Sequence, residues 1–509
     1  MGSRVQKSIK NSLIAVLEQA VFSIMSFICR TVFIYTLGRT YLGFSGLFSD
    51  IFTLLSLAEL GAGTAILYSM YKPAAESDYK KVTALLNLYR RFYHILGIVI
   101  TAAGLCLTPF LSFFVSGIPD MPELPVIYIL YLFNTTASYF FIYKKSILII
   151  DQKNYIASLI FIAVITVQNI LQIIFLLATH NYIVYLVLML CGTITNNLIV
   201  SIYVDRHYKY LKEYSKEKVD LETRKSIFKN VRAMFLSKIS SAVVTSTDNI
   251  LISKFVSTIT LGLYSNYTLF TSMLRAIFTK LFEGLTGSVG NLIATESSEK
   301  VYDTFKKIWF VNFWLVSFCS SALFVLINPF IKLWVGEDYL LDMSIVFMVC
   351  INFYIRFIRN TFITLTDTYG LFSEFRVKCV CEAIINLVVS LIFVRLMNLG
   401  IFGILLGTIV SNVCTNFWYE PYVIFCKQFK VSWMRYFGQY MMYFGSTILS
   451  AGVCYFLCSF IERQGGWISF VLQMICCGMV INVIYFVIYY RTDEFKYLAT
   501  LIKRKLKKV

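Results

Sequence analysis

The chain has 509 residues, of which 58% are hydrophobic and only 15% are charged, and its formal net charge is +18. Soluble globular proteins have about 45–50% apolar and about 25% charged residues, so the composition excludes an array of soluble domains. Apolar runs of about 20 residues, each long enough to cross a bilayer as a helix, recur along the whole sequence. The predicted fold class is therefore all-α, a polytopic membrane protein.

The apolar runs predict about 14 transmembrane helices in two lobes. Six spans form an N-lobe at 1–204, and a charged cytoplasmic connector follows at 205–232. Six more form a C-lobe at 233–426, and an extra helix pair at 427–490 precedes a basic tail at 491–509. The predicted spans are 12–37, 42–71, 92–116, 126–150, 156–178, 183–204, 233–256, 262–294, 308–334, 343–366, 378–397, 401–426, 438–460 and 468–490.

The lysines and arginines predict the orientation of these spans. With the amino terminus inside, 35 of the 46 fall in inner segments and 5 at or near the outer ends. Because basic residues are retained on the cytoplasmic side, both termini are predicted to be cytoplasmic. Their placement between apolar runs, with no aromatic–basic recognition motif, argues against a nucleic-acid partner. The tail is expected to lie on the anionic inner leaflet, so membrane lipid is a predicted partner.

Two similar turns suggest an internal repeat. The turn after the first span contains Leu42-Gly43-Phe44-Ser45, and the turn after the seventh contains Leu261-Gly262-Leu263-Tyr264-Ser265. If the match reflects a repeat, the two six-helix bundles have the same orientation, an arrangement found in some transporters.

Charged residues within the tenth span form the clearest candidate site. Polar and charged residues follow each other there at spacings of three and four, which places them on one helical face. Arg356 and Arg359 lie about 20–24 Å from the outer end of this helix, too deep to reach the outer surface. They are predicted to line a cavity; the alternative is structural ion pairs, for instance with Asp367 or Glu382. The complete face is Asn352, Arg356, Arg359, Asn360, Thr364 and Asp367.

Other cations also lie within predicted spans. For Arg30 the alternative to a cavity role is a salt bridge with Asp50 on the next span, and Lys144 and Lys145 can extend to the inner interface. The further candidate cations for substrate binding are Arg30, Arg275, Lys144 and Lys145. Arginine in particular matches phosphate oxygens with its planar fork, so this set suits an anionic substrate such as a phosphate or pyrophosphate head group.

Four intramembrane acids are candidates for ion coupling or for structural pairing. Glu18 and Glu59 are predicted at similar depth, where they could share a proton or hold a cation, although polar packing is the alternative. The full set is Glu18, Asp50, Glu59 and Asp248. The coupling ion, H⁺ or Na⁺, stays open.

The sequence contains no motif for catalysis, metal binding or a cofactor. A nucleotide-binding GxxxxGK[ST] loop, GxSxG and HExxH are all absent. Cys379 and Cys381, or Cys476 and Cys477, have none of the three histidines near them in sequence, so they are interpreted as small apolar residues. No enzyme activity, metal or cofactor is predicted.

Several segments resemble the polysaccharide-transport branch of the multidrug/oligosaccharidyl-lipid/polysaccharide flippase superfamily. RTVFIYTLGRTYLGFSG (30–46) and LSLAELGAGTAILYSMY (55–71) look like the first hairpin of these flippases. TDNILISKFVSTITLGLYSNYTL (247–269) looks like the start of their second lobe. EAIINLVVS and LGIFGILLGT, within 382–408, are similar to their eleventh and twelfth helices. The order and location of these segments resemble Wzx-type flippases over most of the chain.

This resemblance implies movement of an undecaprenyl-pyrophosphate-linked oligosaccharide, a repeat unit of capsule, O-antigen or exopolysaccharide. The lipid would pass from the inner to the outer leaflet of a bacterial cytoplasmic membrane by alternating access, with polysaccharide assembly proteins as possible partners. By position, Arg30 matches the basic residue of helix 1 in such cavities, and Arg275 and Arg356 are second-lobe candidates. The alternatives are a cation-coupled multidrug exporter of the same superfamily and a membrane glycan polymerase.

Overall fold

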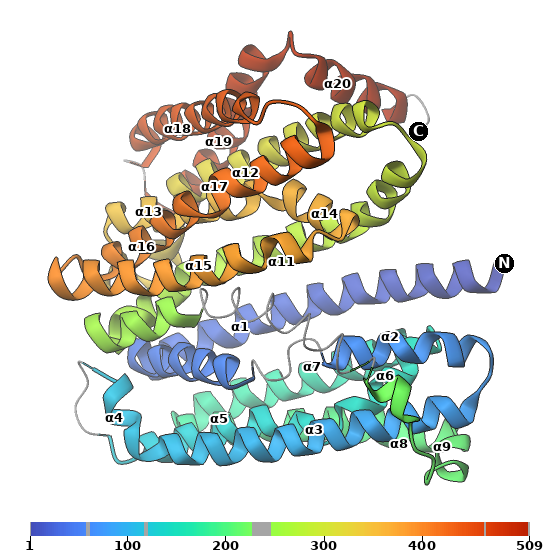
Figure 1. The fold of residues 1–509 in the computed structure, drawn as a ribbon. Helices are drawn as coiled ribbons and strands as arrows, with labels where there is room; N and C mark the ends of the chain where they lie inside the picture. Colours follow the sequence, from blue (N-terminus) through green and yellow to red (C-terminus); the bar gives the residue numbers. More distant parts are fainter. Residues whose placement is uncertain are drawn as a thin grey trace. The chain divides into compact units, whose positions relative to one another are not determined.

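The computed structural model describes residues 2–56, 62–116, 121–225, 227, 246–462 and 465–506, and it is built from helices (Figure 1). These residues contain no strand. They include 11 helices that are long and apolar enough to cross a membrane. The prediction of an all-α, polytopic membrane protein is therefore confirmed.

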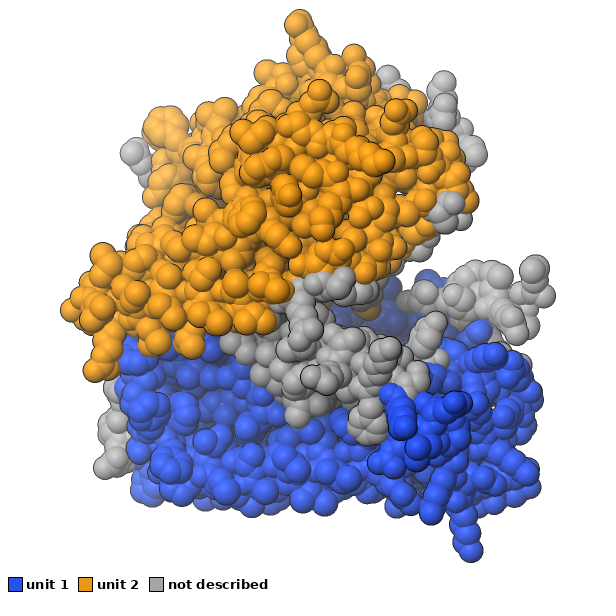
Figure 2. Space-filling model, in the orientation of Figure 1, with its two compact units in different colours: residues 1–262 blue, residues 263–509 orange. Residues whose placement is uncertain are grey.

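The chain forms two compact units, residues 1–262 and 263–509, which Figure 2 shows in different colours. Unit 1 contains the predicted N-lobe together with the described part of the seventh span and the first residues of the eighth. Unit 2 contains most of the predicted C-lobe and the last two spans. The lobe boundaries at 204 and 233 stay a prediction.

A glycine divides the first helix of unit 1. Helix α1 is continuous over Gly2–Leu55 except at Gly38, where φ is 78° and ψ is −170°. This backbone conformation is open to glycine but strained for other residues, so α1 contains two helices joined at Gly38. The two parts correspond to the predicted first span and the start of the second. The other elements of this unit are α2 (Ala62–Ala75), α3 (Tyr79–Leu107), η2 (Thr108–Phe110), α4 (Leu111–Phe114), α5 (Leu124–Tyr139), α6 (Ile142–Ile150), α7 (Asn154–Thr179), α8 (Tyr182–His207), α9 (Tyr210–Glu213) and η3 (Ile252–Val256).

The remaining helices form unit 2, apart from the first residues of α11, which belong to unit 1. They are α11 (Thr258–Thr295), α12 (Ser298–Val335), η4 (Glu337–Tyr339), α13 (Met343–Ile358), α14 (Asn360–Tyr369), α15 (Phe372–Leu391), η5 (Ile392–Leu396), α16 (Gly400–Cys414), α17 (Asn416–Tyr422), η6 (Val423–Phe429), α18 (Met434–Glu462), α19 (Gly466–Tyr489) and α20 (Asp493–Leu506).

Aromatic side chains dominate the core of unit 2. Trp309, Phe310 and Phe313 of α12 are buried, and the Phe313 ring stacks on that of Tyr443 at a centroid distance of 3.9 Å. Tyr489 completes this layer at 5.2 Å from Phe313. Because large rings bury much apolar area, this layer anchors α18 and α19 on α12. The predicted extra helix pair is therefore part of the main core of this unit.

The fourth and tenth predicted spans share one architecture, each interrupted at the same place. Helices α5 and α13 both have 16 residues, and short helices of 9 and 10 residues, α6 and α14, continue them. The two interrupted stretches are each 27 residues long, and the long helical stretches that precede them have 36 and 38 residues. These matching lengths support the internal repeat that the two glycine-containing turns suggested.

Candidate transport site

The break in the tenth span carries a buried ion pair. Arg359 lies between α13 and α14, and its Nε and one terminal nitrogen donate to the two oxygens of Glu420, at 2.9 and 2.5 Å. Lys378 of α15 donates to the same carboxylate at 2.7 Å. The three side chains are only 15%, 6% and 7% exposed. A bidentate pair in such surroundings is held by geometry as well as by charge, so Arg359 has a structural partner in this state.

Amide side chains extend this ion pair into a network across unit 2. Asn412 accepts a hydrogen bond from Arg359 at 3.0 Å and another from Asn416 at 2.7 Å. Asn416 also donates to Glu382 at 2.6 Å. The network spans a second helix interruption, because α16 ends at Cys414 and α17 begins at Asn416. Two interrupted helices thus meet at one charged cluster, an arrangement by which transporters build sites within the membrane.

Arg356 lies one turn before the ion pair but in different surroundings. Its side chain is exposed, as is that of Arg275 on α11, whereas the neighbours Phe353 and Phe357 are buried. Arg356 is 13 residues from the start of α13, or about 20 Å along the helix. A charge at such depth normally faces a water-filled cavity or other protein. The predicted polar face of the tenth span therefore separates into a largely buried residue, Arg359, and an exposed one, Arg356.

Arg30 lies within a cluster of tyrosines in unit 1. It is half-buried and in electrostatic range of Tyr131 and Tyr185. The hydroxyls of Tyr131 and Tyr182 share a hydrogen bond of 2.8 Å, and the rings of Tyr182 and Tyr185 stack at 6.0 Å. Phe33, one turn after Arg30, packs edge-on against Tyr182 at 5.3 Å. The first lobe thus places a cation against several hydroxyl groups.

The candidate acids differ in their contacts and in their burial. Asp50 accepts a hydrogen bond from Asn249 at 2.6 Å, which joins the second part of α1 to the seventh span. Glu18 and Asp248 are half-buried. Glu59 lies outside the described residues, so its predicted proximity to Glu18 stays a prediction.

The two lysines of the fourth span differ in exposure, as do the two arginines of the tenth span. Lys144 donates to Asp205 at 2.6 Å and to Ser201 at 2.7 Å, both on α8, while Lys145 is exposed. The Lys144 side chain is 17% exposed and that of Asp205 is 39% exposed. The fourth and sixth spans of unit 1 are therefore linked by an ion pair, as Arg359 and Glu420 link the tenth and twelfth predicted spans.

The two glycine-containing segments, which were predicted as turns, lie within helices α1 and α11, because the break in the first helix falls earlier, at Gly38. They contact each other within unit 1. A Cβ atom on Gly43 would lie 2.1 Å from the carbonyl oxygen of Thr258, and one on Gly262 would lie 2.3 Å from that of Arg39. We call this close approach the glycine crossing (Arg39, Gly43, Thr258 and Gly262). Only residues without a side chain allow two backbones to come this close.

Hydrogen bonds hold the chain beside the glycine crossing. The Thr258 amide donates to the carbonyl oxygen of Ser116 at 3.1 Å, and the Ser116 amide donates to the Thr258 hydroxyl at 3.3 Å. The Ser116 hydroxyl donates to the carbonyl oxygen of Ser253 at 2.5 Å, and the Ser253 hydroxyl donates to that of Phe114 at 2.9 Å. The end of the third span is thereby joined to the turn between the seventh span and α11.

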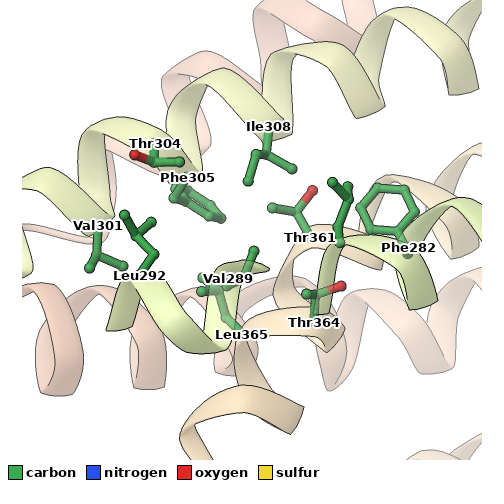
Figure 3. Close-up of a pocket in the computed structure, with 11 residues that line it drawn as sticks. Phe282, Val289, Leu292, Val301, Thr304, Phe305, Ile308, Thr361, Thr364 and Leu365 are labelled. Atoms are coloured by element: carbon green, nitrogen blue, oxygen red, sulfur yellow. The ribbon is translucent and has the colours of Figure 1, made fainter. Parts of the chain in front are cut away.

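Two cavities within the described parts of the units are too small or too apolar for a large charged substrate. One lies between α11, α12 and α14, where Phe282, Phe305, Thr361 and Leu365 surround it (Figure 3). Its volume of about 10 Å³ holds at most one water. A groove of about 310 Å³ lies between α7 and α8 and is lined by Ala163, Val164, Val167, Gln168, Leu171, Leu188, Cys191, Gly192 and Thr195.

Cysteines of the last two spans come together without forming a metal site. The Sγ atoms of Cys458 and Cys477 are 3.8 Å apart, and Cys454 is buried on the same helix as Cys458. Within the described ranges, no group of three or more histidine, cysteine or acidic side chains is placed to hold a metal ion.

Sequence reasoning missed the residue that decides the role of Arg359. Glu420 is a lone acid followed by Pro421 within an apolar run, and this pattern could have marked it. Asn312 on α12, whose side chain donates to the carbonyl oxygens of Phe357 and Ile358 at 3.0 Å each, was missed as well, since a single asparagine in a long apolar helix carries little signal. Both partners are distant in sequence from the residues that they contact, so periodicity alone does not reveal them.

The fold matches that of known membrane transporters. A structure titled "Lipid II flippase MurJ, inward closed conformation" aligns with a TM-score of 0.63, covering 94% of this chain and 98% of that one at 14% identity. An inward-facing multidrug resistance MATE family transporter of the MOP superfamily aligns with a TM-score of 0.61, covering 77% of this chain and 91% of that one, also at 14% identity. The chain shares its fold with both of these structures.

One curated protein is similar to this chain in sequence. The chain is 24% identical over 202 residues to a Yersinia pseudotuberculosis protein named "Putative O-antigen export protein". The match covers 39% of this chain and 45% of the relative, so the chain spans less than half the length of the relative it matches. No protein-family model matches the chain. The predicted resemblance to Wzx-type flippases is confirmed as a resemblance, since the relative is named an O-antigen export protein and one structure of the same fold is titled a lipid II flippase.

Proposed function

We propose that this protein is a flippase that moves an undecaprenyl-pyrophosphate-linked oligosaccharide from the inner to the outer leaflet by alternating access. The relative's name concerns export of O-antigen, and a solved structure of the same fold is titled a lipid II flippase. A lipid-linked glycan matches both descriptions. The cations within the spans match the diphosphate, which is the charged part of such a lipid.

The observation that carries this proposal is the exposed Arg356. Its guanidinium lies about 20 Å along a membrane-spanning helix, next to an arginine that is already paired with Glu420. A guanidinium exposed at this depth requires water, an anion or polar protein groups beside it, because exposure to hydrocarbon would cost at least about 2.5–3.5 kcal/mol. Arg356 and Arg275 are therefore assigned to the substrate's phosphates, with Arg30 as the first-lobe contribution.

In this proposal the chain crosses the bacterial cytoplasmic membrane 14 times, with both termini cytoplasmic. The division of α1 at Gly38 supports two separate spans in this region, and the 38-residue α11 supports a further span. The same orientation places the glycine crossing on the outer side, where it would close the outer exit of the transport path.

A different set of residues is proposed for coupling transport to an ion. Glu18, Asp50 and Asp248 are the described candidates for binding H⁺ or Na⁺, and Asp50 already links α1 to the seventh span through Asn249. A coupling ion at Asp50 would compete with Asn249 for the carboxylate, so binding there would change the contact between these spans.

Arg356→Ala tests the proposal, with Arg359→Ala as the matched control in the same predicted span. Arg356→Ala should abolish flipping and leave abundance near wild type, since the exposed side chain has little role in packing. Arg359→Ala should lower abundance, because it leaves the carboxylate of Glu420 with one cation fewer in a buried site. Collapse of abundance in Arg356→Ala would show a structural role instead and would remove the main support for the proposal.

Lipid extracts of cells depleted of the protein identify the substrate. Accumulation of undecaprenyl-pyrophosphate oligosaccharide on the cytoplasmic side is expected, and its mass would identify the glycan. The second candidate function, a cation-coupled multidrug exporter, is favoured by the MATE-like fold. Sensitivity to cationic drugs without lipid accumulation would support that function and overturn the flippase proposal.

A further inference from the structure

The groove between α7 and α8, which we call the α7–α8 groove, lies at the middle of two membrane-spanning helices of unit 1. Val167 on its α7 side is the fourteenth of the 26 residues of that helix, and Cys191 on its α8 side is the tenth of 26. At about 1.5 Å per residue, both positions are at least roughly 13 Å from either end of their helix. The groove is therefore at the level of the hydrocarbon core of a bilayer.

The α7–α8 groove is open along an apolar face. Ala163, Val167 and Leu171 follow each other at one-turn spacing on α7 and are exposed along it. Gln168 and Thr195 are the two polar residues in its lining. Only 17% of the most apolar stretch of each of the two helices is buried, so this face meets lipid chains in a membrane. The volume of about 310 Å³ corresponds to roughly ten methylene-sized groups, or about two isoprene units.

A glycine makes room for the amide of Gln168 in the wall of the groove. A Cβ atom on Gly192 of α8 would lie 1.9 Å from Oε1 of Gln168, so any larger residue there would displace this amide. Nε2 of Gln168 donates to Oε1 of Gln172, one turn further along α7, at 3.4 Å. Gln172 is buried. The apolar groove thus has one polar wall, and that wall is bonded toward the interior of the unit.

Gln172 joins this polar wall to the tyrosine cluster around Arg30. Its Nε2 donates to the carbonyl oxygen of Tyr185 at 3.1 Å, and the Cys29 thiol donates to its Oε1 at 3.9 Å. Cys29 directly precedes Arg30 on α1, and Tyr185 is in electrostatic range of that arginine. Two hydrogen bonds, through Gln168 and Gln172, therefore lead from the groove to the residue next to Arg30.

The cation decides which lipid the groove can select. In a bilayer an apolar groove alone gives little preference, because the surrounding chains are as apolar as its lining. A cation beside the groove adds a preference for an anionic head group, and a guanidinium matches phosphate oxygens. We propose that the α7–α8 groove holds about two isoprene units of the polyprenyl chain of the lipid whose diphosphate is at Arg30. This inference rests on the proposed function, which assigns Arg30 to the substrate's phosphates.

A two-part site of this kind has a characteristic dependence on the ligand. Because the chain and the diphosphate belong to one molecule, binding of either part raises the effective concentration of the other. A polyprenyl diphosphate should therefore bind at a much lower concentration than a polyprenol without charge or inorganic pyrophosphate without a chain.

Cys191 is a native probe of the groove, since it lines the groove and is exposed. The purified full-length protein in detergent is treated with N-ethylmaleimide, and the modification of each cysteine is followed by mass spectrometry. Undecaprenyl pyrophosphate at about ten times its Kd should slow the labelling of Cys191 about tenfold. Labelling of Cys106, which is exposed on α3, should not change. Equal labelling of Cys191 with and without this lipid would overturn the proposal.

Three comparison compounds test the two parts of the site. Undecaprenol should need a concentration at least about ten times higher for the same protection, and inorganic pyrophosphate should give none. Phosphatidylglycerol, an anionic lipid with straight chains, should not protect Cys191 at the concentration at which undecaprenyl pyrophosphate does. Equal protection by undecaprenol would overturn the link between the groove and Arg30. Equal protection by phosphatidylglycerol would show a groove for any membrane lipid and would also overturn the proposal.

Filling the groove tests where the chain lies. Ala163→Phe places a ring in the groove, and Ala178→Phe is the matched control, because Ala178 is exposed on α7 but does not line the groove. The ratio of Cys191 labelling without and with undecaprenyl pyrophosphate should fall to about one in Ala163→Phe and stay at the wild-type value in Ala178→Phe. Wild-type protection in Ala163→Phe would overturn the proposal.

The groove assignment and the flippase proposal fail on different results. If undecaprenyl pyrophosphate protects Cys191 but depleted cells accumulate no lipid-linked oligosaccharide, the groove assignment stands and the flippase proposal fails. If the lipid accumulates in depleted cells but Cys191 is not protected, the flippase proposal stands and the chain does not lie in this groove.

Discussion

The substitution Gly43→Ala tests the proposal that the glycine crossing closes the transport path on its outer side. The added Cβ would lie 2.1 Å from the carbonyl oxygen of Thr258 and 2.9 Å from the Thr258 carbonyl carbon and methyl group. Carbon–oxygen contacts are normally about 3.3 Å or longer, so the two backbones would have to separate by about 1.2 Å. The obstructing atoms belong to the backbone, and no rotamer change can move them away.

The free-energy cost of this overpacking can be added to the cost of weakening the hydrogen bonds beside the glycine crossing. Inserting one carbon into a tightly packed site costs about 1–3 kcal/mol. The separation also strains the bonds between Thr258 and Ser116, and each hydrogen bond contributes about 0.5–1.5 kcal/mol. Because about 1.4 kcal/mol changes an equilibrium constant tenfold, Gly43→Ala should disfavour the closed crossing by a factor of roughly 5 to 100.

Gly46→Ala is the matched control, three residues further along the same helix. A Cβ at Gly46 would meet the side chain of Leu261 at 3.6 Å, which is an ordinary contact. A cysteine at Ser257, beside the crossing, is labelled in intact cells with a membrane-impermeant maleimide and compared with the parent protein. Faster labelling is expected in Gly43→Ala and not in Gly46→Ala. Equal labelling at equal abundance would refute the reasoning that this contact is a closed exit.

Two further changes test the ion pairs. Glu420→Gln leaves Arg359 and Lys378 without their shared counter-charge in a buried site. It should therefore destabilise the protein by about 3–5 kcal/mol and lower its thermal midpoint in detergent by several degrees. A midpoint within a degree of wild type would contradict the assigned pairing. Lys144→Met should lower the free energy of unfolding by about 1 kcal/mol or less, because the Asp205 side chain that loses its partner is 39% exposed and can be solvated. A decrease as large as that of Glu420→Gln would contradict this expectation.

The sequence by itself determined the class of the protein. Apolar runs long enough to span a bilayer leave no other means of satisfying the backbone than helices, so the all-α membrane fold follows from composition and run length. The superfamily resemblance could also be predicted, because its motifs retain their order along the chain. Similarly, the glycines at 43 and 262 were visible as a repeated sequence pattern, although both lie within helices and not in turns.

The roles of individual charges depended on tertiary structure. Arg356 and Arg359 are three residues apart on one predicted face, yet one is exposed and the other is buried against Glu420, 61 residues away. The same holds for Lys144 and Lys145, of which only the first meets Asp205. Helical spacing predicts that two side chains share a face, but it does not predict what packs against that face.

The helix breaks show the same division between local and tertiary information. Neither Phe140 nor Arg359 is a proline or glycine, so the local sequence does not predict a helix break at these positions. The breaks persist because His94 and Asn312, on helices more than 40 residues earlier in the chain, donate to the carbonyls that the breaks expose. Sequence thus determined which segments enter the membrane, and tertiary hydrogen bonds decided where those helices stop and resume.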